Sequence, residues 1–197
     1  MNDYTDAQQN TMLRIAAQSI QHGLEQGTPL EVFSFEFDPK LQEFRATFVT
    51  LEIHGQLRGC IGMLKAIKPV IEDVAQNAYS AAFKDPRFPP LTYNEFGNLD
   101  IHISILTPAE DFPVKDEADL LQQLRPNIDG LILQEGPYQS TFLPSVWESL
   151  PAPKDFLRSL KHKAGLSEDH WSNTIQFKRY QTLSFGSEVS DLVLEKV

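Results

Sequence analysis

The segment LRGCIG at residues 57–62 combines the residue types that nucleophilic chemistry at sulfur requires. Its cysteine, Cys60, lies between Gly59 and Gly62, and glycine is used where the backbone bends unusually or another group must approach closely. Alternate residues of a strand share a face, so we expect Arg58 beside the Cys60 thiol, where a cation favours the nucleophilic thiolate. The alternative is that Cys60 is a small buried hydrophobic residue.

A second group of polar residues lies in the segment NAYSAAFKDPRFPPL, residues 77–91. Asp85 and Arg87 bracket Pro86, whose fixed φ angle gives the pair a preset geometry. One interpretation is that Arg87 faces an anionic group while Asp85 orients it. The other is that the pair satisfies backbone groups in a loop that ends a helix. Because an exposed arginine gains little from a fixed backbone, we expect the Arg87 guanidinium to be held by Asp85 or by backbone carbonyls near residues 57–62.

His102 is the histidine best suited to act as a base. It alternates with apolar residues, on the same strand face as Asp100 and Ser104, and it could take a proton from Cys60 if the two strands are neighbours. The alternative is a histidine on a solvated sheet face. The other histidines lack metal-site spacing, and a single cysteine excludes an internal disulfide or a CxxC pair. We therefore predict no metal and no resident cofactor.

The elements that must position these residues alternate between helices and strands. The capping-box spacing of Thr5 and Gln8, with a glycine at position 27, predicts a helix over residues 5–26. Alternating phenylalanines predict a strand over residues 33–37, and a turn at His54-Gly55 predicts a β-hairpin that returns through residues 57–62. The remaining expected elements are helices over residues 70–83, 116–124 and 153–164, and strands over residues 99–106, 130–133, 140–143 and 174–180.

Several consecutive strands are joined by connections too short for parallel crossovers. The expected fold class is therefore α+β, with a mainly antiparallel sheet flanked by helices. No repeat, low-complexity tract or Gly/Ser linker divides the chain, and 197 residues suffice for one domain or for one domain with a modest lobe.

Charge restricts the class of partner. The chain holds 27 acidic and 17 basic residues and has a net charge of -10, which argues against direct binding of nucleic acid or of an anionic membrane. Residues 56–90 are the exception, because their five basic residues exceed their three acidic ones and hint at a local anion-facing site. No stretch approaches the ~20 apolar residues of a membrane span, and the N-terminus lacks the features of a signal peptide. We expect a cytoplasmic protein.

Residues 57–62 and the segment DPRFPPL together resemble the AMMECR domain family, also called protein A of the AmmeMemoRadiSam system. Further family motifs occur here in the family's order: FVTLEIHG, LDIHISILTP, DGLIL, TFLPSVWESLP and FLRSLKHKAGL. The resemblance covers about residues 44–180, and it implies a single family domain over residues 1–197 with a smaller α+β lobe. The residues that the resemblance assigns to the family's cleft are Arg58, Gly59, Cys60, Ile61, Gly62, Asp85, Arg87 and Phe88.

Two hypotheses for the function follow. In the first, the chain is an enzyme-like component of a modification system, with Cys60 as nucleophile or covalent carrier, Arg58 or Arg87 as the cation, and His102 as the base. The resemblance implies a Memo-like protein and a radical-SAM enzyme as partners. In the second, the chain is a non-catalytic regulatory or adaptor protein that binds a ligand or a protein at residues 57–62, and its acidic surface attracts basic partners. We prefer the first hypothesis, and expect a monomer or a homodimer.

Overall fold

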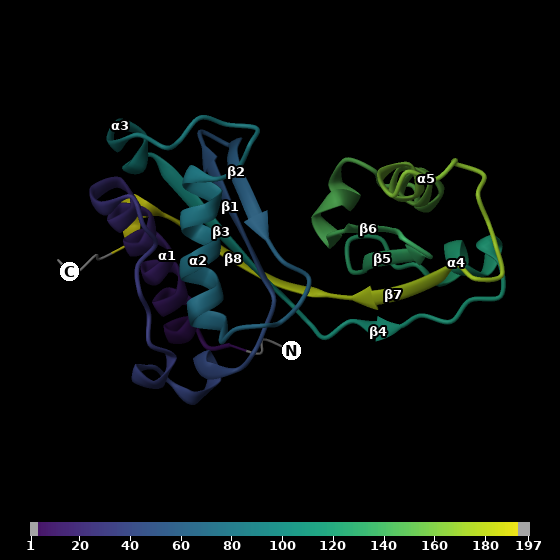
Figure 1. Cartoon of the computed structure of the whole chain (residues 1–197), viewed down its shortest axis with the longest axis horizontal. Helices are drawn as coiled ribbons and strands as arrows, with labels where there is room; N and C mark the ends of the chain where they lie inside the picture. The colour runs from purple at the N-terminus through teal and green to yellow at the C-terminus, as the bar shows by residue number, and fades with distance from the viewer. Residues whose placement is uncertain (1–3, 193–197) are drawn as a thin grey trace. The chain divides into compact units, whose positions relative to one another are not determined.

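The computed structural model describes residues 4–192. They divide into two compact units, the first made of the chain up to Leu106 and from Leu183 onward, the second of Thr107–Thr182 (Figure 1). Each unit has a four-stranded sheet and a hydrophobic core of its own. The expected α+β class is confirmed. Among the described helices, none is both long enough and apolar enough to cross a membrane.

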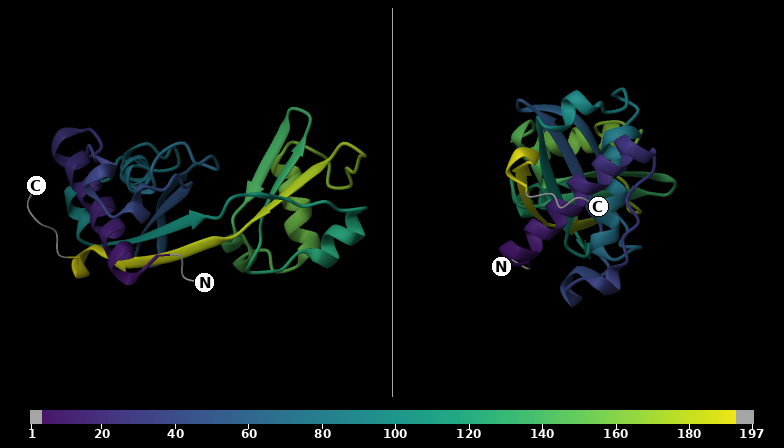
Figure 2. Two further views of the ribbon diagram at one scale, coloured as in Figure 1. Left: turned by 90° about the horizontal axis from the view of Figure 1, so that it is seen from below. Right: turned by 90° about the vertical axis from the view of Figure 1, so that its left-hand side faces the viewer.

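The sheet of the first unit has the strand order β2-β1-β3-β8. Its strands are β1 (Thr47–Ile53), β2 (Gln56–Gly62), β3 (Leu99–Leu106) and β8 (Thr182–Glu188). β1 pairs antiparallel with both β2 and β3, and β3 and β8 run side by side in opposite directions (Figure 2). Helices α1 (Asp6–Gln26) and α2 (Val70–Phe83) pack against each other across one face of this sheet (Figure 1).

Local signals in the sequence correctly located the main elements of this unit. Thr5 and Gln8 form a reciprocal capping box at the start of α1, and Gly27 ends it in the left-handed conformation. The hairpin turn uses His54 and Gly55, with φ angles of 53° and 72°, as tight hairpin turns require. The short helix α3 (Tyr93–Phe96) follows the proline-rich loop.

The strand expected over residues 33–37 is wrong. This segment contains a 3-10 turn, Ser34–Glu36, and the side chains of Phe33 and Phe35 are 47% and 74% exposed. The Ser34 N–H donates to the Glu72 carboxylate of α2 rather than to a strand. Alternation of apolar residues predicts a strand only where a partner strand can accept its hydrogen bonds, and none of the strands within residues 4–192 pairs with this segment.

The second unit has the strand order β4-β7-β5-β6, with all three pairings antiparallel. These strands are β4 (Glu110–Asp111), β5 (Gly130–Glu135), β6 (Tyr138–Phe142) and β7 (Gln176–Tyr180), and the helices are α4 (Glu117–Gln123) and α5 (Pro153–Lys163). The core centres on Trp147 and Phe156, whose rings stack with centroids 3.8 Å apart. The sequence correctly indicated both helices and three of these strands. It did not indicate β8 of the first sheet, in whose interior Gly186 weakens the strand signal.

Candidate functional site

The segment LRGCIG forms β2, an edge strand of the first sheet. Thr50 and Leu51 of β1 pair with Cys60 and Gly59, but the next residue of β1, Glu52, pairs with Leu57. Arg58 is therefore the extra residue of a β-bulge, and a bulge interrupts the alternation of side chains along a strand. The expectation that Arg58 lies beside the Cys60 thiol rested on that alternation and stays a prediction.

The Arg58 side chain connects β2 to the loop and the helix that follow α2. Its Nε donates to the Glu95 carboxylate at 2.7 Å, and its Nη2 donates to the Pro89 carbonyl at 2.9 Å. The side chain is only 10% exposed. The hydrogen bond from Arg58, followed by the one from Thr92, lowers the pKa of Glu95 to about 2. Arg58 thus stabilises the fold around the site.

Both glycines of the motif are required by close packing. A Cβ atom on Gly59 would collide with the backbone carbonyl of Ala81 in α2, and one on Gly62 would collide with the Thr47 carbonyl and the Phe48 ring. Gly59 therefore lets α2 approach β2 closely, on the face where Leu51 is buried. Since neighbouring residues of a strand point to opposite faces, the Cys60 side chain lies on the face away from α2.

Asp85 and Arg87 bind both backbone groups of Cys60 that point away from β1. The Cys60 N–H donates to Asp85 Oδ2 at 2.9 Å, and Arg87 Nη2 donates to the Cys60 carbonyl at 3.4 Å. Arg87 also donates two hydrogen bonds to the Asp85 carboxylate, at 2.9 and 2.6 Å. The pair thereby supplies the donor and the acceptor that a neighbouring strand would supply, and it protects the edge of the sheet.

This geometry confirms that the Arg87 guanidinium is held by Asp85 near residues 57–62. Asp85 is only 4% exposed, and the hydrogen bonds from Arg87 hold the pKa of its carboxyl well below the ordinary range. The pKa of Arg87 is raised, first by its hydrogen bond to Asp85 and to a lesser degree by the charge of a Cys60 thiolate. The Arg87 guanidinium is therefore held beside the backbone of Cys60.

The Cys60 thiol is half-buried and accepts a hydrogen bond from the Thr50 hydroxyl at 3.2 Å. Thr50 pairs with Cys60 on one side and with His102 on the other. β1 therefore separates Cys60 from His102, and two strand spacings place their Cα atoms roughly 10 Å apart. The condition under which His102 would serve as the base, neighbouring strands, is not met. Its imidazole instead binds Asp100, at 3.1 Å, and lies over Gly186, where a side chain would displace it.

The remaining residues assigned to the cleft lie around this cluster. The Phe88 ring lies 5.8 Å from the Arg58 guanidinium carbon and 5.4 Å from that of Arg87, so it packs between the two cations. Ile61 is partly buried against the core of the first unit. The structure thus brings the eight residues together along β2 and the loop that follows α2.

Three potential metal ligands that sequence spacing did not indicate lie on the same sheet. One ligand atom from each of Glu52, Asp100 and His102 lies within 4.8 Å of the other two. Glu52 and Asp100 face each other directly on β1 and β3. Two carboxylates and an imidazole suit a divalent transition-metal ion. Only the strand register reveals this grouping, because 48 residues separate Glu52 from Asp100.

The chain combines an α+β fold with a glycine-flanked cysteine on an edge strand, and an Asp-Pro-Arg loop binds the backbone of that cysteine. These features define its class. The chain belongs to the AMMECR1 family, whose sequence model matches residues 13–185. Over 164 residues it is 36% identical to a protein of Methanothermobacter thermautotrophicus, covering 81% of this chain and 83% of the relative. It is 37% identical to protein MJ0810 of Methanocaldococcus jannaschii over 163 residues, which cover 78% and 79% of the two chains.

A solved structure has a similar fold. The crystal structure of the uncharacterized protein PH0010 from Pyrococcus horikoshii matches with a TM-score of 0.86 and 30% sequence identity, covering 94% of each chain. The family resemblance seen in the sequence is therefore confirmed over most of the chain.

Proposed function

We propose that the chain is the thiol-bearing component of a cytoplasmic modification system, with Cys60 as nucleophile or covalent carrier. The observation that carries this proposal is the difference between the backbone of Cys60, which is bound by two side chains, and its thiol, which stays accessible. Its backbone N–H and carbonyl are both bound, by Asp85 and Arg87, while its thiol stays half-buried on the sheet face away from α2. A cysteine used only to fill space would be buried among apolar side chains.

The surroundings of the sulfur support this role. The Thr50 hydroxyl donates a hydrogen bond to Sγ, and Arg87 contributes a nearby positive charge. Both interactions favour a negatively charged sulfur, and the bound backbone holds it in place for attack. Among residues 4–192, no histidine or carboxylate hydrogen-bonds to the sulfur, so in this proposal the substrate or a partner supplies the proton acceptor. The family resemblance suggests a Memo-like protein and a radical-SAM enzyme as partners.

The same lack of a base favours the second candidate, a non-catalytic regulatory or adaptor protein. Leu57 and Met63, at the two ends of β2, are 42% and 37% exposed. Exposed apolar side chains beside an edge strand suit the binding of another protein. If the chain is an adaptor, the small size and the bound backbone of Cys60 shape the binding surface, and its sulfur has no chemical role.

Alkylation of the native full-length chain by iodoacetamide distinguishes the two candidates. Because Cys60 is the single cysteine, the rate reports on it alone. The first candidate predicts alkylation without denaturant, at a rate that falls several-fold in Arg87→Gln and in Thr50→Val, since each removes a group that favours the thiolate. Arg158→Gln, which removes an exposed arginine paired with Glu168, is the matched control. A thiol that reacts only in denaturant supports the adaptor.

A further inference from the structure

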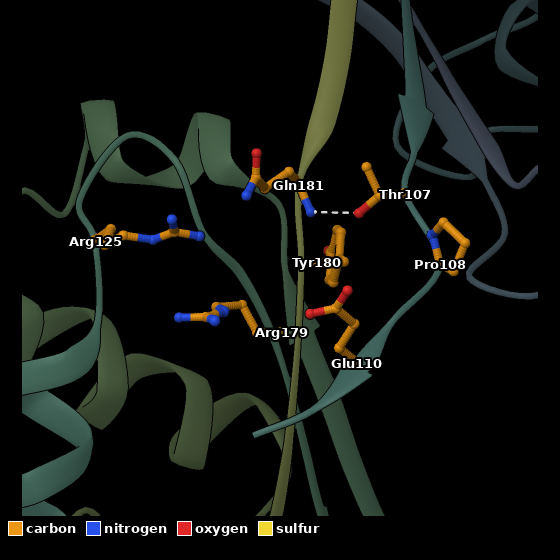
Figure 3. A pocket seen from close by; sticks show the side chains of 7 residues that line it. All are labelled: Thr107, Pro108, Glu110, Arg125, Arg179, Tyr180 and Gln181. Carbon is orange, nitrogen blue, oxygen red and sulfur yellow. Dashed lines mark hydrogen bonds between the residues drawn. The ribbon is translucent and has the colours of Figure 1, made fainter. Parts of the chain in front are cut away.

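The second unit contains a cavity of about 280 Å³ between the end of β7 and the segment that leads into β4 (Figure 3). All of its lining residues belong to this unit. They are Thr107, Pro108, Glu110, Arg125, Arg179, Tyr180 and Gln181. The volume lies at the lower end of the range of small-molecule sites, ~300–1,000 Å³, so the cavity has room for a small ligand only.

Two guanidinium groups approach each other on one side of β7, those of Arg125 and Arg179 (Figure 3). Between them they have one buried counter-ion, Asp129, which is fully buried. Its carboxylate accepts hydrogen bonds from the Arg125 N–H at 2.9 Å and from Arg125 Nη2 at 2.6 Å, whereas Arg179 Nη1 lies 3.9 Å away. Glu110, which also lines the cavity, pairs directly with Arg179 across β4 and β7, so two carboxylates balance the two guanidinium charges.

Arg179 carries the spare hydrogen-bond donors. Within residues 4–192 its guanidinium donates no hydrogen bond, although its Cζ is held 4.6 Å from the centre of the Phe112 ring and its side chain is 30% exposed. The Gln181 side-chain amide likewise has no hydrogen-bond partner in that range, because only its backbone binds Thr107. A stacked guanidinium with five unused donors is preorganised for a planar acceptor.

Glu110 limits the charge of the ligand. It pairs directly with Arg179 across β4 and β7, is exposed, and its charge contributes to raising the pKa of Arg125. Its carboxylate repels a doubly charged ligand more strongly than a singly charged one. A single carboxylate on the ligand can therefore bind the unused donors of Arg179 with less repulsion, and Glu110 can accept a hydrogen bond from the far end of the ligand.

We infer that this cavity of the second unit binds a small monocarboxylate, whose planar carboxylate is received by the Arg179 fork with Arg125 beside it. Planar bidentate pairing is the strongest geometry that arginine offers an oxyanion. The inference does not depend on the role proposed for Cys60, because the residues involved lie outside the first unit.

The test is NMR of the ¹⁵N-labelled full-length chain, observing arginine Nε–Hε signals while sodium acetate replaces sodium chloride at constant ionic strength. We expect the Arg179 signal to move saturably with acetate, while that of Arg158, already bound to Glu168, stays fixed. Arg179→Gln should abolish binding, followed through the backbone signal of Gln181. Arg179→Lys, which keeps the charge and much of the stem over Phe112, should weaken it about tenfold through loss of the planar fork.

Three results would overturn the inference: an Arg179 signal that does not saturate with acetate, binding that survives in a folded Arg179→Gln chain, or inorganic phosphate binding more tightly than acetate. The last would identify a phosphate site instead of a carboxylate site. Glu110→Gln provides an independent check, because removing the repulsion should tighten phosphate binding more than acetate binding. A melting curve for each variant confirms that it is folded.

Discussion

Each unit of the molecule contains a buried aspartate that binds an arginine nearby in the sequence and a backbone N–H. In the first unit, Asp85 is 4% exposed and binds Arg87 together with the N–H of Cys60. In the second, Asp129 is fully buried and binds Arg125 through both its side chain and its backbone N–H. The chemistry of the two pairs is similar, but their surroundings are not.

The two Asp–Arg pairs differ in the groups that face the remaining guanidinium N–H donors. Arg87 donates to the Cys60 carbonyl, so the first pair completes the edge of a sheet. Beside Asp129 a second arginine, Arg179, faces a cavity with its donors unused. A buried Asp–Arg pair is therefore not evidence of function in itself. The number of cations per carboxylate, and the presence of a backbone acceptor, decide whether donors remain for a ligand.

The largest effect is expected when Asp129 is removed. Asp129→Ala leaves the Arg125 guanidinium and backbone N–H without their acceptor and Arg179 without its ion-pair partner, and should lower the free energy of unfolding by about 3–5 kcal/mol. Asp85→Ala should cost less, about 1–3 kcal/mol, because Arg87 is 54% exposed and can be solvated. Urea denaturation measures both, with exposed Asp169→Ala as the control. Equal losses would mean that burial alone sets the energy of these pairs.

The second prediction separates geometry from charge at Arg87. If its planar fork holds the edge of β2, Arg87→Lys should destabilise the chain nearly as much as Arg87→Ala, by about 0.5–1.5 kcal/mol. If only the positive charge matters, lysine should restore most of the stability. Thermal melts compare the two variants, and a lysine variant that melts like the parent would refute the structural role of the fork.

The acid side of the stability curve should depend on the carboxylates of the first unit. The pKa of Glu95 falls from 4.5 to about 2 in the folded chain, and that of Asp85 is lowered too. A lowered pKa stabilises the fold above the ordinary pKa, and this stabilisation is lost as the pH falls. Unfolding free energies measured from pH 4.5 down to pH 2 should therefore decrease, and Glu95→Gln should flatten the decrease. An unchanged slope in that variant would contradict the assignment.

A smaller effect of opposite sign is expected at Glu52. Glu52 and Asp100 are carboxylates that face each other directly across β1 and β3, and within the described part of the chain neither forms an ion pair with lysine or arginine. Like charges in this position are destabilising. Glu52→Gln should therefore raise the free energy of unfolding by about 0.2–1 kcal/mol at neutral pH, relative to an exposed control, Glu36→Gln. A loss of stability would show that His102 already neutralises the pair.

The smallest effect is expected on limited proteolysis. We predict that the chain behaves as one domain over residues 1–197 and yields no pair of stable fragments cut at residues 107–116. The reason is that this short segment contributes β4, which pairs with β7, and that the chain returns to the first unit at Leu183. Recovery of two separately folded fragments after trypsin treatment would show that the two regions fold independently.

Local patterns in the sequence determined the elements whose signals are carried by neighbouring residues. The caps of α1, the His54-Gly55 turn, the alternating strand β3 and the proline-bounded helix α2 all follow from interactions within a few residues. The hydrogen bonds between Asp85 and Arg87 were predictable for the same reason, since only Pro86 separates the two residues in the chain. The family motifs added the remaining residues around Cys60.

Only the tertiary structure decided where polar side chains go once the elements pair. A bulge lies at Arg58, whose guanidinium binds Glu95, and β1 lies between Cys60 and His102. The cavity lined by Arg125 and Arg179 unites segments more than 50 residues apart. The periodicity of apolar residues indicates which face of a helix or strand is apolar, but it does not identify the element that packs against that face. Strand order, register and the counter-ion shared by two arginines depend on contacts between distant parts of the chain.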